Sequence, residues 1–337
     1  MERRRFLSST SAVAAVVGLS LSMAGCAGTE TISATSSPTA SPPQADFAGL
    51  VDIGDDREIY LECSGAGSPT VVLVSGKGNG ARDGWSEALA PGDPVHQEPE
   101  DEVAVGGGDL QERESAVFPS VSEFTRVCAY SRPGTGLDGP DTSTPVTQPH
   151  PIDDAVADLH ATLDASGEPG PYVLVGHSYG GLIVRLFAGR YPQDVAGVVM
   201  NDPLTEFMTE TATAEELANW NESNRATDGV VEGIELLPAM KTTGAAPLMP
   251  EVPAVVLSSD KPPNSEGLAA LEERFGAVPP HSAWLAAVEL LAMSLDAKHI
   301  TETNSGHNIE VYQPQLVTGA IEEVVDVVRG GRPRVTG

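Results

Sequence analysis

The chain has 337 residues, 40% of them hydrophobic, which is enough for one α/β domain with a sizeable core. Its 48 acidic residues outnumber its 19 basic residues, and the formal net charge is −29. This excess of negative charge disfavours nucleic acids and anionic lipid surfaces as partners. It fits an exported or salt-adapted protein surface and carries no information about the fold.

The first 26 residues predict an export signal. Arginines at positions 3–5 match the twin-arginine pattern, and the weakly apolar stretch 12–23 is too short for a stable membrane span. Met23-Ala24-Gly25-Cys26 is similar to a bacterial lipobox with Met in place of the usual Leu. We therefore expect Cys26 to be lipidated and to hold the protein at the outer face of the cytoplasmic membrane. The alternative is a plain cleaved signal, which would give a secreted protein.

Two further segments have the composition of solvent-exposed segments outside the core. Residues 27–46 are mostly Ser, Thr, Ala and Pro, which predicts a disordered tether, and the folded domain is expected to span 47–330. Residues 93–114 contain eight acids and one base, which predicts an acidic, solvent-exposed insertion. This insertion lacks the Asp-x-Asp-x-Asp spacing of a calcium loop.

Strands and helices are predicted to alternate along the domain. Short apolar runs rich in β-branched residues predict strands at 59–63, 70–74, 124–130, 173–176, 195–200, 252–258 and 297–302. Helices are predicted at 85–89, 152–166, from 182 onward, and at 315–329. This alternation predicts an α/β fold, with a mostly parallel sheet that carries helices on both faces.

One segment interrupts the alternation. Residues 203–251 have helical patches at 214–219 and 230–237 but no strong strand, so we expect a small helical cap over the site. A simple surface excursion is the alternative.

The most informative motif is Gly176-His177-Ser178-Tyr179-Gly180-Gly181. It contains G-x-S-x-G between a predicted strand and a predicted helix, which is the context of a nucleophile elbow. So sharp a turn strains the backbone of the central residue and exposes the Ser178 hydroxyl at the edge of the sheet. Small neighbours are needed for the chain to turn there.

A serine at an elbow needs a base and an acid, which follow in the order Ser, acid, His in this architecture. Four of the seven histidines precede Ser178, and His307 lies in a loop directly after the last predicted strand. His307 is the expected base, because His281 and His299 are better explained as structural residues. Asp260, which follows the strand 252–258, is the favoured acid, and Asp202 after the preceding strand is the alternative.

The expected oxyanion donors are the main-chain N–H of Tyr179, directly after the serine, and that of Lys77. Lys77 lies in the glycine-rich loop 75–80, whose glycines permit a ligand to approach the backbone closely. No Gly-Lys-Ser/Thr follows, which excludes a phosphate-binding loop.

If Cys26 is lipidated, Cys63 and Cys128 remain as a pair in an oxidising compartment. Neither has a second Cys or His nearby, so no zinc site is expected.

Residues 47–330 resemble the α/β-hydrolase superfamily, and in particular bacterial serine hydrolases with the elbow Gly-His-Ser-Tyr-Gly-Gly. The loop 75–80, the turn 132–134, the elbow and the sequence 305–307 carry this resemblance. Residue 131 is Ser, where relatives often have Asp, and this difference concerns local turn structure more than catalysis. The resemblance implies the α/β-hydrolase fold, in whose strand order the strands of Cys63 and Cys128 are neighbours. It thereby makes the predicted disulfide more specific.

The resemblance also implies a serine hydrolase that cleaves an ester-type bond of a small molecule through an acyl-enzyme, with no cofactor or metal. Dehalogenases and epoxide hydrolases of this fold use an elbow Asp, so Ser178 argues against both. Iminopeptidases or amidases and cofactor-free haloperoxidases keep the serine triad and stay open as alternatives. A catalytically dead, surface-tethered binding protein is the alternative from another class.

Overall fold

The computed structural model describes residues 45–89, 111–135, 141–225, 232–262, 265–331 and 335. The expected export signal with Cys26, the tether up to residue 44 and the acidic insertion up to residue 110 lie outside the described residues.

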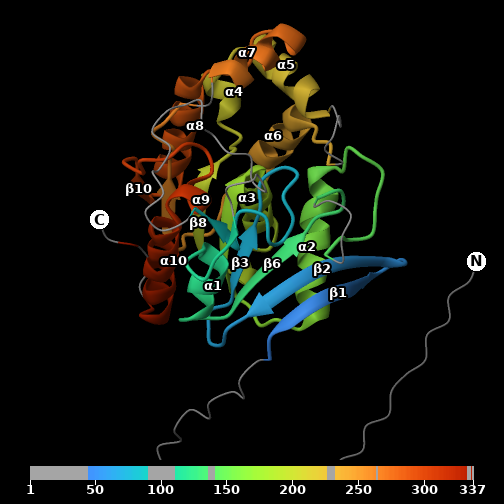
Figure 1. Ribbon diagram of the computed structural model, residues 1–337, viewed down its shortest axis with the longest axis vertical. Helices are drawn as coiled ribbons and strands as arrows, with labels where there is room; N and C mark the ends of the chain where they lie inside the picture. Colours follow the sequence, from blue (N-terminus) through green and yellow to red (C-terminus); the bar gives the residue numbers. More distant parts are fainter. Residues whose placement is uncertain are drawn as a thin grey trace, which may run out of the picture. The chain divides into compact units, whose positions relative to one another are not determined.

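An eight-stranded, mostly parallel sheet forms the centre of the domain (Figure 1). The pairs β1–β2 and β2–β6 are antiparallel, and the other neighbours in the sheet are parallel. In spatial order the strands are β1 (Phe47–Gly54), β2 (Arg57–Ser64), β6 (Val127–Ser131), β3 (Val71–Val74), β7 (Tyr172–Ser178), β8 (Val195–Pro203), β9 (Ala254–Leu257) and β10 (Lys298–Ile300). The predicted mostly parallel sheet is confirmed.

Helices cover both faces of the sheet (Figure 1). One apolar cluster joins it to α2 (Ile152–Ser166), α3 (Tyr179–Arg190) and α8 (His281–Ser294). The other joins it to α1 (Val117–Ser122), α9 (Ile309–Tyr312) and α10 (Pro314–Arg329).

The two faces explain why the central strands are apolar throughout. In β3, Val72 and Val74 belong to the cluster that includes α2 and α3, whereas Val71 and Leu73 belong to the cluster that includes α10. All four side chains are fully buried, as expected for a strand with helices on both sides.

After Pro203, the last residue of β8, the segment expected to be a cap contains no strand among its described residues. Its helices are α4 (Met208–Thr211), α5 (Ala214–Arg225) and α6 (Leu236–Ala245), and α7 (Ser265–Phe275) follows β9. Helices α5 and α7 are in contact with each other and lie at the upper end of the view in Figure 1.

Several local predictions differ from the structure, and the helical patch expected at 230–237 begins only at Leu236, the start of α6. Residues 85–89 were expected to be helical, but Glu87–Ala88 forms strand β4 and pairs with β5 (Gln111–Glu112). Tertiary contacts override the local helical preference, since the buried indole of Trp85 donates a hydrogen bond to Ser75 Oγ at 2.8 Å. Strand β1 was not predicted from the sequence.

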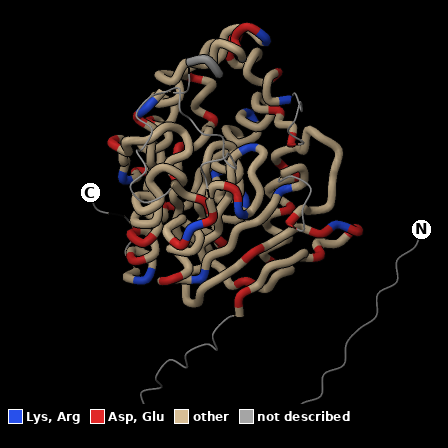
Figure 2. The backbone as a smooth tube through the Cα atoms, in the orientation of Figure 1, with Lys and Arg blue, Asp and Glu red and all other residues tan. Residues whose placement is uncertain are grey.

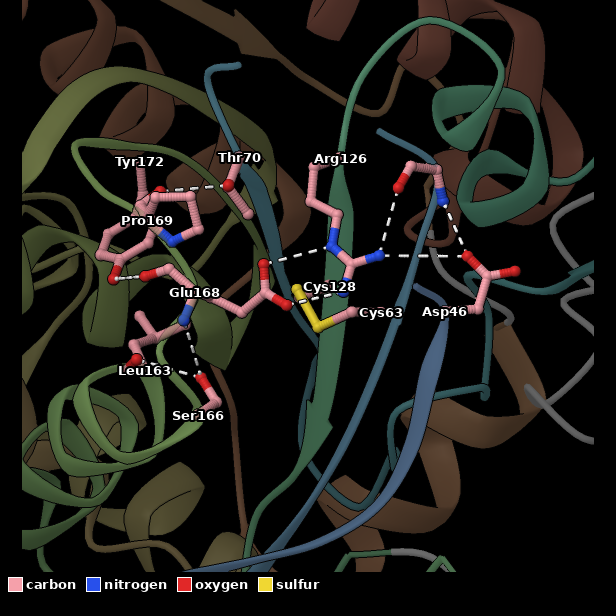
Figure 3. Close-up of a disulfide and its surroundings, with 11 residues drawn as sticks. Asp46, Cys63, Thr70, Arg126, Cys128, Leu163, Ser166, Glu168, Pro169 and Tyr172 are labelled. Carbon is pink, nitrogen blue, oxygen red and sulfur yellow. Dashed lines mark hydrogen bonds and ion pairs between the residues drawn. A yellow bond between two sulfur atoms is a disulfide. The ribbon is translucent and has the colours of Figure 1, made fainter. Parts of the chain in front are cut away.

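The disulfide Cys63–Cys128 is confirmed and joins β2 to β6 (Figure 3). The two cysteines are direct cross-strand partners in the antiparallel register, and both are buried. Beside them, the guanidinium of Arg126 binds both carboxylate oxygens of Glu168 at 3.1 and 2.6 Å.

Acidic residues predominate along the chain in Figure 2, while several of the few arginines are used inside the fold. Arg126, Arg132 and Arg185 are buried and form ion pairs with glutamates. In the part of the chain that the structure describes, no helix combines the length and the hydropathy needed to cross a bilayer.

Removal of the disulfide is expected to destabilise the domain. The bond closes a loop with a sequence separation of 65 residues, and chain-entropy arguments assign such a loop about 4 kcal/mol of stabilisation. The double variant Cys63→Ala/Cys128→Ala should lose about this much free energy of unfolding in urea titrations. A loss below about 1 kcal/mol would contradict the expectation, because it would mean that the cross-link hardly constrains the unfolded chain.

Candidate active site

Ser178 is the last residue of β7, and α3 begins at the next residue, so no loop separates strand from helix. Its backbone has φ +51° and ψ −122°, a conformation that non-glycine residues rarely adopt. The Ser178 side chain does not cap α3 and is partly exposed. These are the features expected of a nucleophile elbow.

The close packing behind the elbow requires glycine at position 180. A Cβ atom at this position would lie 2.1 Å from the main-chain oxygen of Val74, at the end of β3. Because the conflicting atom is backbone, a side chain here would have to move the strand or the turn. The glycines of the motif therefore follow from the contact between α3 and the sheet.

The loop 75–80 lies against the elbow, as the sequence predicts. A Cβ atom built on Gly76 would lie 3.2 Å from the Cβ of Ser178. The Lys77 side chain points away, since its Nζ donates to Asn224 O at 3.0 Å. Burial lowers the pKa of this amine, while Glu232 opposes the shift.

The N–H of Tyr179 is the first of α3, so it has no intrahelical acceptor and suits an anion.

His307 lies between the last strand and α9, and its Nδ1 is 2.6 Å from Asp202 Oδ2. Asp202 is part of β8, where the following residue, Pro203, is the register partner of Ser178. The ring of His177, next to the serine, lies 4.7 Å from the ring of His307. The structure thus brings Ser178, His307 and Asp202 to the same edge of the sheet.

Asp202 is almost fully buried, at 1% exposure, and its carboxylate is well supplied with donors. Oδ1 accepts hydrogen bonds from Ser259 N–H at 2.9 Å and from Trp284 Nε1–H at 3.1 Å. Burial alone would raise the pKa of Asp202, but the hydrogen bond and charge of His307, with these two donors, lower it below its ordinary value. The group is therefore an anion that can orient His307.

Asp260, the favoured acid in the sequence analysis, is not the carboxylate that pairs with His307 Nδ1. Its carboxylate is exposed and accepts the main-chain N–H groups of Asn304 and Ser305 at 3.0 and 2.9 Å. Asp260 follows β9, one strand farther from the elbow than β8, and holds the start of the loop that carries His307. The residue paired with His307 is the alternative, Asp202.

The two other late histidines make different contacts. His299 on β10 is 2.7 Å from Ser258 Oγ, and His281 at the start of α8 is 3.1 Å from Ser259 Oγ. Neither is bonded to Asp202 in the contacts of the described chain, in agreement with their structural interpretation.

A buried ion pair connects the segment 203–251 to the loop beside Ser178. Arg132 binds Glu232 through Nε at 2.7 Å and also donates to the carbonyl oxygens of Ser75 and Gly76 at 2.9 and 2.6 Å. The second oxygen of Glu232 accepts the N–H of Gly78 at 2.6 Å. These contacts fix the direction of the loop that contains Lys77.

A cavity of about 320 Å³ lies next to His307 and Asp202. Its remaining walls are largely aromatic and aliphatic, with Trp220, Leu268, Val278, Pro279 and Trp284 among them. The edge of Trp284 packs against the ring of His307, with centroids 5.2 Å apart. An apolar cavity with polar groups at one end is typical of a small-molecule site.

Comparisons with known proteins agree with this architecture. The model of the alpha/beta hydrolase fold family matches residues 104–230. A crystal structure of a membrane phospholipase A superposes with a TM-score of 0.51 at 16% identity, covering 85% of this chain and 86% of that one. The chain has the alpha/beta hydrolase fold, and residues 104–230 are similar to the family of that name.

Two relatives by sequence match shorter parts of the chain. An uncharacterized protein of Schizosaccharomyces pombe is 33% identical over 157 residues, which are 45% of this chain and 28% of that protein. Lipase LipV of Mycobacterium tuberculosis is 38% identical over 90 residues, which are 25% of this chain and 34% of LipV. The aligned part is less than half the length of either relative.

The sequence analysis missed three contributors to this hydrolase-fold site. Ser259 and Trp284 bind Asp202, and Glu232 binds the glycine-rich loop. Each comes from a segment that is distant in sequence from its partner, so no local motif marks it. Arg132, the partner of Glu232, does lie in a recognisable local pattern, the Arg-Pro-Gly turn after a predicted strand.

Loss of the Glu232 carboxylate is expected to destabilise the fold. Glu232→Ala leaves the fully buried Arg132 guanidinium without its anion, which should cost about 3–5 kcal/mol of unfolding free energy in urea titrations. The matched control is Glu222→Ala, whose carboxylate is exposed and lies 3.9 Å from Arg225, and it should cost less than about 1 kcal/mol. Equal losses in the two variants would contradict this interpretation.

Proposed function

We propose that the chain is a serine hydrolase that cleaves a carboxylic ester of a small molecule. Ser178 is the nucleophile, His307 the general base and Asp202 the acid that orients the base. The observation that carries the proposal is the 2.6 Å contact between His307 Nδ1 and the buried Asp202 carboxylate, beside a serine held in a strained turn.

In the proposed reaction, His307 removes the proton of the Ser178 hydroxyl while its oxygen attacks the ester carbonyl. The N–H groups of Tyr179 and Lys77 donate to the oxyanion that forms. His307 then passes the proton to the leaving alcohol, and the acyl group stays on Ser178. A water molecule, deprotonated by His307, attacks the acyl-enzyme and releases the acid and free Ser178.

An ester is favoured over an amine-bearing substrate by the way the acids of segment 203–251 are used. The buried acids among its described residues are Glu206 and Glu232, and each pairs with an arginine, Arg185 or Arg132. They are therefore not available to hold the ammonium group that an iminopeptidase must bind. The name of LipV, a lipase, supports the same reaction class.

The cavity beside His307 supports a small substrate. Its volume of about 320 Å³ is at the lower end of the range for small-molecule sites, and its apolar walls suit an acyl or alkyl group.

We also propose that the enzyme works outside the cytoplasm, tethered through a lipid on Cys26. The basis is the sequence pattern of residues 3–5 and 23–26. The disulfide Cys63–Cys128 supports this location, because disulfides persist in oxidising compartments.

The test compares two asparagine variants in the hydrolysis of p-nitrophenyl butanoate. Asp202→Asn should lower kcat by about 10³–10⁴-fold, because an amide favours the wrong tautomer of His307. Asp260→Asn is the matched control, and it should lower kcat by less than about tenfold, because its carboxylate accepts main-chain N–H groups of the loop, lies 4.0 Å from Lys261 Nζ and is not the partner of His307 Nδ1.

A larger loss in Asp260→Asn than in Asp202→Asn would reverse the assignment. If the wild-type protein hydrolyses none of a panel of small esters, the proposal of an ester hydrolase is wrong, and a non-catalytic binding protein becomes the better interpretation.

A further inference from the structure

A buried carboxyl group lies behind His307 and has no part in the reaction described above. Glu310 is the second residue of α9, three positions after His307, and is 1% exposed. Its Oε2 accepts a hydrogen bond from Asn201 Nδ2 at 2.6 Å, and its Oε1 lies 3.2 Å from His177 Nδ1. Both partners are themselves buried at the ends of β7 and β8.

His177 connects this carboxyl group to the backbone of the proposed base. Its Nε2 lies 3.1 Å from the carbonyl oxygen of His307. A carbonyl oxygen can only accept, so Nε2 must bear the hydrogen of this bond. The other ring nitrogen, Nδ1, faces Glu310.

These contacts fix the number of protons that His177 and Glu310 share. If Nδ1 has no hydrogen, Glu310 must be a neutral acid that donates from Oε1. If Nδ1 has one, the pair is an imidazolium and a carboxylate. Both arrangements hold two protons, and an ionised Glu310 beside a neutral His177 satisfies only one of the two contacts.

The surroundings favour the neutral pair. Two ions at 1% and 2% exposure would lose most of their hydration. An imidazolium at His177 would also lie 4.7 Å from the His307 ring and oppose the positive charge that His307 must accept. Burial, assisted by His307, lowers the pKa of His177 to about 3, and burial raises the pKa of Glu310 to about 7.

We propose that Glu310 is a positioning residue that acts as a neutral carboxylic acid: Glu310 Oε1–H donates to His177 Nδ1, so that His177 Nε2–H holds the His307 carbonyl and with it the base. This inference rests on the proposed role of His307. It adds to the catalytic set a residue that touches no reacting atom.

A dependence on pH follows. The titratable groups that face the pair in the described chain are His307, from the loop, and Asp202, from β8. When Glu310 loses its proton, Oε1 faces the lone pair of Nδ1, and His177 can satisfy the carboxylate only by giving up the His307 carbonyl. Activity should therefore decline as pH rises through the pKa of Glu310.

Stability should change in the same direction. The folded-state pKa of Glu310 is raised from 4.5 to about 7, so its contribution to stability is fully present below pH 4.5. This contribution is lost as pH rises to about 7. A Gln side chain at position 310 has no proton to lose and should not show the change.

The experiment compares Glu310→Gln and Glu310→Leu with the wild type from pH 5 to pH 9. Gln reproduces the neutral acid, since its amide can donate to His177 and accept from Asn201, whereas Leu can do neither. Glu310→Leu should lower kcat on the order of 100-fold with little change in KM, because the base is displaced rather than removed. Glu310→Gln should recover most of that loss and lack the alkaline decline. The control is Glu323→Gln, on α10, which should keep the wild-type profile.

A second readout does not depend on hydrolysis. Nitrogen-15 spectra of histidine-labelled protein at pH 6, assigned with His177→Gln, should show a protonated Nε2 and an unprotonated Nδ1 in His177. Two protonated nitrogens would overturn the proposal in favour of the ion pair. So would a Glu310→Gln variant as inactive as Glu310→Leu, or a Glu310→Leu variant as active as wild type.

The two readouts distinguish a failure of this inference from a failure of the proposed function. If the wild type hydrolyses no ester but the spectra show a His177 protonated at Nε2 alone, the proton assignment stands and the proposed function fails. If hydrolysis depends on Asp202 but His177 is doubly protonated, the function stands and the inference fails. If Glu310→Leu does not fold, the spectra and the pH profile of Glu310→Gln still decide.

Discussion

The abrupt passage from β7 to α3 is the constraint on which the site depends. Without a loop residue between them, the chain can turn only through the strained backbone of Ser178. That turn exposes the Ser178 hydroxyl and directs the first N–H of α3 toward the same space. It also requires α3 to approach β3 so closely that position 180 has no room for a side chain. The loop 75–80 is brought beside the serine by the same contact.

Around this turn, the buried charged groups are paired with partners that stabilise their charge. Asp202 is kept ionised by His307, Ser259 and Trp284, and Arg132 is kept ionised by Glu232. In the account proposed here, the pair behind His307 is kept neutral instead. With an anion on one side of the base and a neutral pair on the other, His307 can accept a proton during the reaction and release it.

Much of this arrangement follows from the sequence. The helix 152–166, the elbow at Ser178, the position of His307 after the last strand and the pairing of Cys63 with Cys128 all agree with the structure. These features depend on local patterns or, for the disulfide, on the strand order that the resemblance to the α/β-hydrolases implies.

The acid could not be inferred in the same way, because Asp202 and Asp260 both follow strands and both satisfy the chain order. The choice depends on where each strand lies in the sheet, since β8 is the neighbour of β7 and β9 is one strand farther away. Asp202 also has φ +39° at the end of β8, a local turn of the backbone that the Asn-Asp-Pro sequence did not distinguish from an ordinary turn. Contacts such as those of Glu232 and Trp284 arise only once segments distant in sequence are packed together.

A fluorophosphonate probe shows whether Ser178 is an activated nucleophile. Such probes phosphonylate a serine only when a base activates its hydroxyl and an oxyanion site holds the phosphoryl oxygen. We expect one probe molecule to attach to the wild-type protein, peptide mass spectrometry to place it on Ser178, and Ser178→Ala to stay unlabelled. A wild-type protein that stays unlabelled, or that is labelled at a different serine, would contradict the account.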